Sequence, residues 1–277
     1  MKKSNTKFFR AVGMMIGAII GVGVFGLPYA LSQSGFGLGL LELILIGLVL
    51  TVMQFMLAEL VLQTPQNHRL VGHVRQRLGK GWSWLTLAAM LFGIWGAMIA
   101  YMIIGGRFLH ILFSPILGGP EIVYSFVVAG IGALLIHKGL RFASKIEVIV
   151  VSALLFLFLF IIVASVPHIQ AEHFFTMDLT KAFLPYGVIL FSLAGIGIVP
   201  EMEDVLGRKH RNKLGSAILV GMAVIVFLYI LFSFAVVGVT GSLTTPAAFD
   251  GLIPVLGPTF GIIATFLGSL TILSLYI

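Results

Sequence analysis

Long apolar runs separated by short polar segments dominate the chain. Because these runs are apolar on nearly every face, run length and flanking charge define the elements better than helical periodicity does. A helix needs about 20 residues to cross the hydrocarbon core of a bilayer. The pattern predicts an all-α membrane fold of about eight transmembrane helices, near residues 9–31, 38–62, 83–106, 121–136, 146–165, 184–206, 216–238 and 258–277.

Composition places these helices in a membrane. Of the 277 residues, 59% are hydrophobic and only 10% are charged, whereas a soluble domain carries about 25% charged residues. The chain has too little polar surface to cover a water-soluble fold, so its expected partner is a lipid bilayer. The absence of cysteine excludes disulfides and thiolate chemistry.

Charge predicts the orientation of the chain. The net charge is +7, and most of the 17 Lys and Arg residues lie in four short segments between apolar runs. A cytoplasmic N-terminus places all four segments on the cytoplasmic side, as the positive-inside rule requires. We expect a multi-pass protein of the cell membrane whose basic segments meet anionic lipid and no nucleic acid. The segments contain Lys2, Lys3, Lys7 and Arg10; Arg69, Arg75, Arg77 and Lys80; Lys138, Arg141 and Lys145; and Arg208, Lys209, Arg211 and Lys213.

Two of the runs predict interrupted helices. The first contains Gly-Val-Gly at 21–23 and the sixth contains Gly-Ile-Gly at 195–197, and each is followed by a proline, Pro28 or Pro200. Clustered glycine lowers the cost of non-helical backbone, and proline removes a backbone donor. In lipid, freed backbone groups are tolerated only where they line a cavity or bind a ligand. Close helix packing through small residues is the alternative reading of the first run.

The two interruptions are related as an inverted repeat. Residues 21–24 read Gly-Val-Gly-Val and residues 195–198 read Gly-Ile-Gly-Ile, and in the predicted topology the two spans run in opposite directions. Helix rise places both near the middle of the bilayer, roughly 20 Å from Phe8 and about 15 Å from Gly207. Paired interruptions at corresponding places of an inverted repeat indicate the binding site of a transporter.

The chemistry of the broken ends predicts an amino acid as the substrate. The half-helix that starts after Gly23 points free N–H groups and a positive dipole at the midplane, which suits a carboxylate. The half-helix that ends near Leu193 offers free carbonyl groups, which suit an ammonium group or a metal cation. An anion-binding end close to a cation-binding end matches an α-amino acid.

The segment Ile-Gly-Val-Gly-Val-Phe-Gly-Leu-Pro at 20–28 resembles the first-helix signature of the amino acid–polyamine–organocation transporters. Phe-Ser-Leu-Ala-Gly at 191–195, followed by Pro-Glu at 200–201, is similar to their sixth helix. Within this superfamily, the chain is most similar to the aromatic amino acid permease and amino acid–auxin permease branch.

The resemblance implies a five-plus-five inverted-repeat fold like that of bacterial leucine transporters, with helices 1 and 6 discontinuous. The chain would be one transporter domain over residues 1–277, with a first repeat at about 9–165 and an incomplete second repeat at about 184–277. The same resemblance implies that backbone binds the substrate carboxylate in the first break and its amine in the second. It implies, too, that Tyr101 contacts the substrate, although a tyrosine of an interfacial aromatic belt is the alternative. The expected substrate-binding residues are Ile20, Gly21, Val22, Gly23, Tyr101, Ser192, Leu193, Ala194 and Gly195.

Acidic residues inside the spans are candidates for coupling to an ion. Glu201 lies about 6 Å below Gly197 by helix rise, so it is a candidate carrier of a coupled proton. The alternative is a carboxylate that completes the first turn of the inner half-helix. Glu59 is a second candidate, for which pairing with a loop cation is the alternative.

Hydroxyl groups in the last span form a candidate sodium site. Thr271 and Ser274 lie about one turn apart and could complete a site with carbonyl groups near Ala18 and Gly21. Ser and Thr in membrane helices more often bond to their own backbone, so this alternative stays open.

We therefore expect secondary active transport of amino acids, aromatic or apolar, coupled to H⁺ or Na⁺ and without a further cofactor. The last run reaches Ile277 without a polar flank, so we expect a truncated chain, and a non-transporting subunit or remnant is the alternative. An intramembrane enzyme fits less well, because the sequence has neither an aspartate pair nor a His-x-x-x-His motif. The particular amino acid and the oligomeric state are left open by the sequence.

Overall fold

The computed structural model of the chain describes residues 2–64, 68–138 and 140–276, and in these ranges its regular elements are helices, with no strand. Within the described ranges, four helical segments are long and apolar enough to cross a membrane, or five if Asn5–Ile19 and Gly23–Ser34 count as one interrupted span. Shorter apolar helices occupy Glu121–His137, Leu155–His168 and Pro258–Leu273. The prediction of an all-helical, multi-pass membrane protein is confirmed. Helices occupy all eight predicted ranges, whereas the number of spans stays a prediction.

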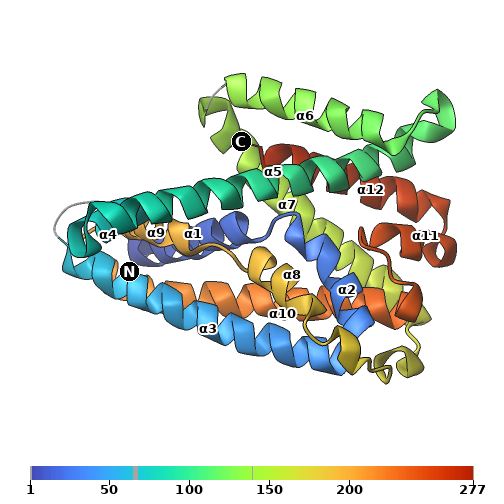
Figure 1. The fold of residues 1–277 in the computed structure, drawn as a ribbon, viewed down its shortest axis with the longest axis horizontal. Helices are drawn as coiled ribbons and strands as arrows, with labels where there is room; N and C mark the ends of the chain where they lie inside the picture. Colours follow the sequence, from blue (N-terminus) through green and yellow to red (C-terminus); the bar gives the residue numbers. More distant parts are fainter. Residues whose placement is uncertain (1, 65–67, 139, 277) are drawn as a thin grey trace. The chain divides into compact units, whose positions relative to one another are not determined.

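The helices follow one another in the order drawn in Figure 1, from blue at the N-terminus to red at the C-terminus. Two of them, α4 and α11, lie in segments predicted as loops, because 9 and 8 residues are too few for a span. The α-helices are α1 (Lys2–Ile19), α2 (Gly23–Ser34), α3 (Phe36–Gln63), α4 (Leu70–Leu78), α5 (Lys80–Leu117), α6 (Glu121–Lys138), α7 (Leu140–Ser165), α8 (Leu184–Ser192), α9 (Val199–Leu206), α10 (Leu214–Thr240), α11 (Phe249–Leu256) and α12 (Pro258–Ser274). Short 3₁₀ turns are η1 (Val166–His168), η2 (Ala171–Phe174), η3 (Leu179–Lys181), η4 (Ile196–Ile198), η5 (Arg211–Lys213) and η6 (Gly241–Leu243).

The chain forms two compact units, and each unit takes parts of several spans. One division along the chain falls between Ile20 and Gly21, and another falls between Ser192 and Leu193. Both divisions therefore coincide with the predicted interruptions. Unit 1 comprises Met1–Ile20, Ile44–Gly96 and Leu193–Phe227, and unit 2 comprises Gly21–Leu43, Ala97–Ser192 and Leu228–Ile277.

Aromatic rings fill the core of unit 2, where α2 packs along α8 and α12 packs against α7 and α11. The buried ring of Phe25 on α2 meets the rings of Phe108 and Phe249 edge-on, at centroid distances of 5.3 and 5.2 Å. Phe108 and Phe249 stack on each other at 4.8 Å. A Cβ at Gly268 would lie 2.7 Å from the Phe108 ring, so glycine allows α12 to approach. Each such pair contributes about 0.5–1.5 kcal/mol beyond its buried area.

In unit 1, α1 packs along α9. The ammonium group of Lys7 on α1 donates to the carbonyl of Leu206, the last residue of α9, at 3.2 Å. A cation at this end of a helix satisfies an unpaired carbonyl and complements the helix dipole. Along α1, a Cβ at Gly221 would lie 2.6 Å from the sulfur of Met15, so glycine lets α10 pack closely against α1.

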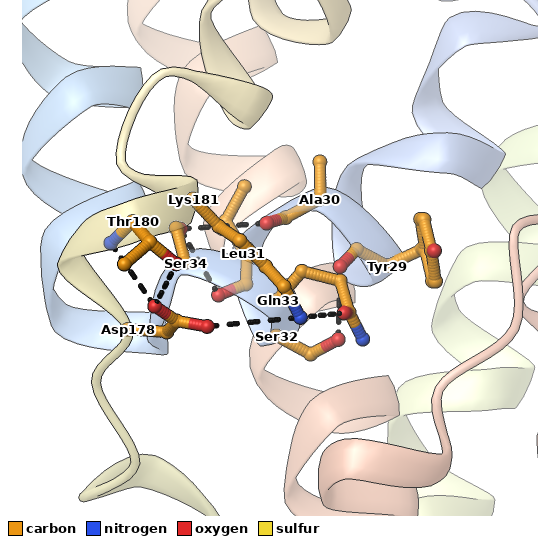
Figure 2. A network of polar contacts seen from close by, with 9 residues as sticks. All are labelled: Tyr29, Ala30, Leu31, Ser32, Gln33, Ser34, Asp178, Thr180 and Lys181. Atoms are coloured by element: carbon orange, nitrogen blue, oxygen red, sulfur yellow. Dashed lines mark hydrogen bonds and ion pairs between the residues drawn. The ribbon is translucent and has the colours of Figure 1, made fainter.

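Polar contacts in unit 2 hold the C-terminal end of α2 against the segment that contains η3 (Figure 2). The backbone N–H of Asp178 donates to the carbonyl of Ser34 at 3.1 Å, and the Lys181 ammonium donates to the amide oxygen of Gln33 at 2.9 Å. The Asp178 carboxylate accepts from the Thr180 hydroxyl and amide groups and pairs with Lys181. The Thr180 donors, with a smaller contribution from Lys181, lower the pKa of Asp178 below its ordinary value. The ionised carboxylate thus orders the turn η3, whose backbone and Lys181 side chain contact the end of α2.

Candidate substrate-binding site

The first break lies between α1, which ends at Ile19, and α2, which begins at Gly23 (Figure 1). The predicted residues Ile20, Gly21 and Val22 are the non-helical link, and both Ile20 and Val22 are buried. The amide N–H groups of Val24 and Phe25 donate to the carbonyls of Gly21 and Val22, at 3.3 and 3.2 Å. Two of the N–H groups that were expected to be free for a substrate carboxylate are thus paired within this tight turn.

The second break begins where α8 ends at Ser192. Leu193, Ala194 and Gly195 are non-helical, and the turn η4 then leads into α9. Leu193 is fully buried, whereas Ala194 is exposed. The Ser192 hydroxyl donates to the carbonyl of Val188 at 2.7 Å, inside its own helix. Both predicted interruptions are therefore present, at the residues that the glycine and proline spacing indicated.

The two breaks meet, and each unit contains one of the contacts. In unit 2, a Cβ at Gly23 would lie 2.6 Å from the hydroxyl oxygen of Ser192 and 2.9 Å from the ring of Phe191. In unit 1, a Cβ at Gly195 would overlap the side chain of Ile19 and lie 2.7 Å from its Cδ1. Glycine is thus required at both positions by the close approach of the other break. Close helix packing, which was the alternative interpretation of the first run, therefore explains the glycine at position 23. A role of Gly23 in binding a carboxylate stays a prediction.

A residue that the sequence did not single out, Tyr229 on α10, also reaches the second break. Its side chain is fully buried, and its hydroxyl donates to the carbonyl of Ser192 at 2.9 Å. The signal in the sequence was a tyrosine near the middle of a long apolar run. A buried tyrosine hydroxyl normally finds a hydrogen-bond partner, but the sequence cannot indicate which one.

Tyr101, the predicted aromatic contact, lies on α5 in unit 2 and is partly buried. Its ring meets the ring of Tyr276 nearly edge-on, at a centroid distance of 5.5 Å. The hydroxyl of Tyr276 in turn donates to the carbonyl of Met98 at 3.4 Å. The Tyr101 ring thus packs against the C-terminal end of unit 2, and its contact with substrate stays a prediction.

The acidic candidates for ion coupling lie in unit 1. Glu201 is in the first turn of α9, its side chain is 44% exposed, and a carboxylate oxygen lies 3.9 Å from the Arg69 guanidinium. This position matches the helix-start alternative, in which a carboxylate complements the N-terminal dipole. Glu59 accepts a hydrogen bond from the Gln63 amide at 3.1 Å, one turn further along α3.

The candidate sodium ligands are only partly described. The Thr271 hydroxyl donates to the carbonyl of Leu267 at 2.9 Å, which is the backbone bond foreseen as the alternative. Ala18 is exposed near the end of α1. The side chain of Ser274 lies outside the described part of the structure. Among the described residues, no group of three or more His, Cys, Asp or Glu side chains could hold a metal ion.

An ion pair outside the predicted site joins α5 to α11 in unit 2. Arg107 on α5 donates to the carboxylate of Asp250 on α11. The two side chains are 34% and 21% exposed, and the neighbouring rings of Phe108 and Phe249 stack on each other. Sequence reasoning missed this pair because 143 positions separate its members.

Apolar membrane helices with two interrupted spans that meet at their breaks are typical of membrane transporters. The family model of the tryptophan/tyrosine permease family matches residues 4–258, and the chain belongs to this family. Its members and the relatives of the chain are permeases and not enzymes, in agreement with the prediction from sequence.

Three relatives illustrate the relationship. The tyrosine-specific transport system 1 of Haemophilus influenzae is 26% identical over 230 residues, which cover 81% of this chain and 56% of the relative. Tryptophan-specific transport proteins of Shigella flexneri and Pseudomonas aeruginosa are each 24% identical, over 80% and 82% of this chain and 55% and 56% of their own length. The chain thus spans a little more than half the length of these relatives.

We expect Gly195→Ala to lower the thermal unfolding midpoint of the purified protein in detergent. The new methyl group would overlap Ile19, and overpacking of this kind costs about 1–3 kcal/mol. Adding Ile19→Ala should restore part of the midpoint, because the two side chains compete for one space. Gly197→Ala is the matched control, since a Cβ there meets nothing within 4 Å. Equal effects of the two glycine substitutions would contradict the contact between the breaks.

We expect Asp250→Asn to lower the same midpoint, because it leaves the partly buried Arg107 without its charged partner. Removing one member of a buried pair costs about 3–5 kcal/mol, so this half-exposed pair should lose about 1–2 kcal/mol. Lys181→Ala breaks the more exposed pair with Asp178 and should change the midpoint little. An unchanged midpoint in Asp250→Asn would show that the α5–α11 pair adds nothing to stability.

Proposed function

We propose that the chain contains the amino-acid-binding region of an aromatic amino acid transporter. The observation that carries this proposal is the meeting of two interrupted spans in a chain that belongs to a permease family. Backbone groups at such breaks are the part of a membrane protein that can bind a charged substrate without ionisable side chains. On this proposal the breaks form the substrate site, and the helices around them supply the frame that moves.

The substrate that we propose is tyrosine or tryptophan. The matched relatives are described as tyrosine-specific and tryptophan-specific transporters. Within this chain, Phe25 lies two residues after Gly23, and its ring contacts Phe108 and Phe249. Aromatic walls beside a few polar groups suit a ligand with one charged end and one aromatic end.

The binding mode that we propose follows the polarity of the two half-helices. The carboxylate would approach the backbone at 20–23, near the N-terminal end of α2, and the ammonium group would approach the backbone at 192–195, near the C-terminal end of α8. Tyr101 would contact the aromatic part of the substrate. The frame for this site would be the five-plus-five inverted repeat of the amino acid–polyamine–organocation superfamily, in its aromatic amino acid permease branch.

We further propose that the N-terminus is cytoplasmic and that transport is coupled to H⁺ or Na⁺. The distribution of Lys and Arg supports the orientation. Glu201 and Glu59 are the proton candidates, and Thr271 and Ser274, with backbone near Ala18, are the sodium candidates.

If the breaks bind substrate, the purified chain in lipid nanodiscs should bind labelled tyrosine or tryptophan saturably and more tightly than alanine. Gly23→Leu should abolish binding, because the added side chain would be forced against Ser192 and Phe191 at the junction of the breaks. Gly13→Leu is the control, since a Cβ at Gly13 meets nothing within 4 Å. Insertion and monodispersity of each variant must be checked first. Undiminished affinity in a well-inserted Gly23→Leu protein would exclude the breaks as the site, and no saturable binding by the wild type would exclude the function.

If Glu201 carries a coupled proton, Glu201→Gln should keep substrate exchange in proteoliposomes but lose uptake driven by a pH gradient. Exchange needs no net proton movement, whereas uphill uptake requires the carboxylate to load and release a proton. Asp204→Asn is the control, because Asp204 is the nearer partner of Arg69, at 3.3 Å. Retained pH-driven uptake in Glu201→Gln would remove this residue from the coupling mechanism. A sodium requirement raised by Thr271→Ala would favour sodium instead.

A further inference from the structure

The side chain of Tyr229 forms a hydrogen bond from another helix to the backbone of the second break. It lies within α10 in unit 2, its side chain is fully buried, and its hydroxyl donates to the carbonyl of Ser192 at 2.9 Å. Ser192 is the last residue of α8. The bond therefore gives the last carbonyl of α8 a donor from another helix.

The carbonyl of Ser192 needs a partner because α8 provides none. The last four carbonyl groups of a helix have no intrahelical donor, and an unpaired one is costly where water is excluded. The Ser192 hydroxyl cannot supply the bond, since it already donates to the carbonyl of Val188. Tyr229 thus stabilises the interrupted conformation, and its bond fixes the direction in which the Ser192 carbonyl points.

The same residue connects Tyr229 to the first break. Gly23 lies so close to Ser192 that a Cβ would be 2.6 Å from the hydroxyl oxygen and 2.9 Å from Cα. A rotation of Ser192 would therefore disturb the start of α2 as well as the end of α8. The residue that accepts the hydrogen bond from α10 thus contacts both half-helix ends in unit 2.

We propose that Tyr229 is a positioning residue for the amine of the substrate. It acts through Ser192: by holding one lone pair of that carbonyl, it aims the other toward the position of the ammonium group. A carbonyl oxygen can accept two hydrogen bonds, so the tyrosine and an ammonium group can share it. This inference rests on the proposed amino acid site and adds a residue that sets its affinity for one end of the ligand.

The test compares three ligands that differ only in their charged groups. Tyr229→Phe keeps the ring and removes the donor. It should weaken the binding of tyrosine and of tyramine, which has the amine but no carboxylate, by about tenfold, the effect of about one hydrogen bond. Binding of 3-(4-hydroxyphenyl)propionate, which has the carboxylate but no amine, should change less than about twofold. The affinities are measured by competition with labelled tyrosine in nanodiscs.

Tyr124→Phe is the matched control. Tyr124 is also buried in unit 2, and its hydroxyl donates to a backbone carbonyl, that of Gly118, at 2.6 Å. This variant loses the same kind of bond and should leave all three affinities unchanged. If Tyr229→Phe does not insert, 3-fluorotyrosine at position 229 retains the hydroxyl as a stronger donor and should tighten tyrosine binding.

The outcomes separate this inference from the proposed function. Wild-type protein that binds none of the ligands would overturn the function, and the role of Tyr229 with it. Wild-type binding with unchanged tyrosine affinity in Tyr229→Phe, or weaker binding in the fluorotyrosine protein, would overturn the inference alone. Equal losses for all three ligands, or the same losses in Tyr124→Phe, would reduce Tyr229 to a general packing role.

Discussion

A helix that stops inside a membrane leaves backbone donors and acceptors that must find new partners, and this constraint governs the structure around both breaks. At the first break, Val24 and Phe25 donate to carbonyl groups in the turn that precedes α2. At the second, Tyr229 donates to the carbonyl of Ser192 at the end of α8. Local bonds thus pair two N–H groups at the start of α2, and a side chain from another helix pairs the last carbonyl of α8.

Close packing then holds the satisfied ends together. In unit 2, Gly23 lies against Ser192, and in unit 1, Gly195 lies against Ile19. A methyl group at either glycine would meet atoms of the opposite break, so the lack of a side chain serves contact as well as backbone freedom. A substrate that inserted its charged groups here would have to fit between ends that already touch.

Away from the breaks, charged residues form the contacts that fix helix positions. Lys7 satisfies the last carbonyl of α9 in unit 1, and Arg107 pairs with Asp250 between α5 and α11 in unit 2. The far end of α2 is tied to η3 through the Asp178 network (Figure 2). An ammonium or guanidinium group suits these contacts because it both carries charge and donates hydrogen bonds.

The sequence by itself determined the solvent, the helices and the places where two of them stop. Run length and composition indicate the lipid environment and the helices, because lipid demands apolar helices of a fixed length. The Gly-x-Gly segments at 21–23 and 195–197, with their prolines, indicate where two helices are interrupted. Only the tertiary structure decided what each break contacts. The bond from Tyr229 to Ser192 joins residues 37 positions apart, and the Arg107 pair spans 143; no local pattern encodes such partners. Helix period and propensity depend on neighbours along the chain. The hydrogen-bond partner of a buried carbonyl depends instead on which donor the tertiary packing brings close to it.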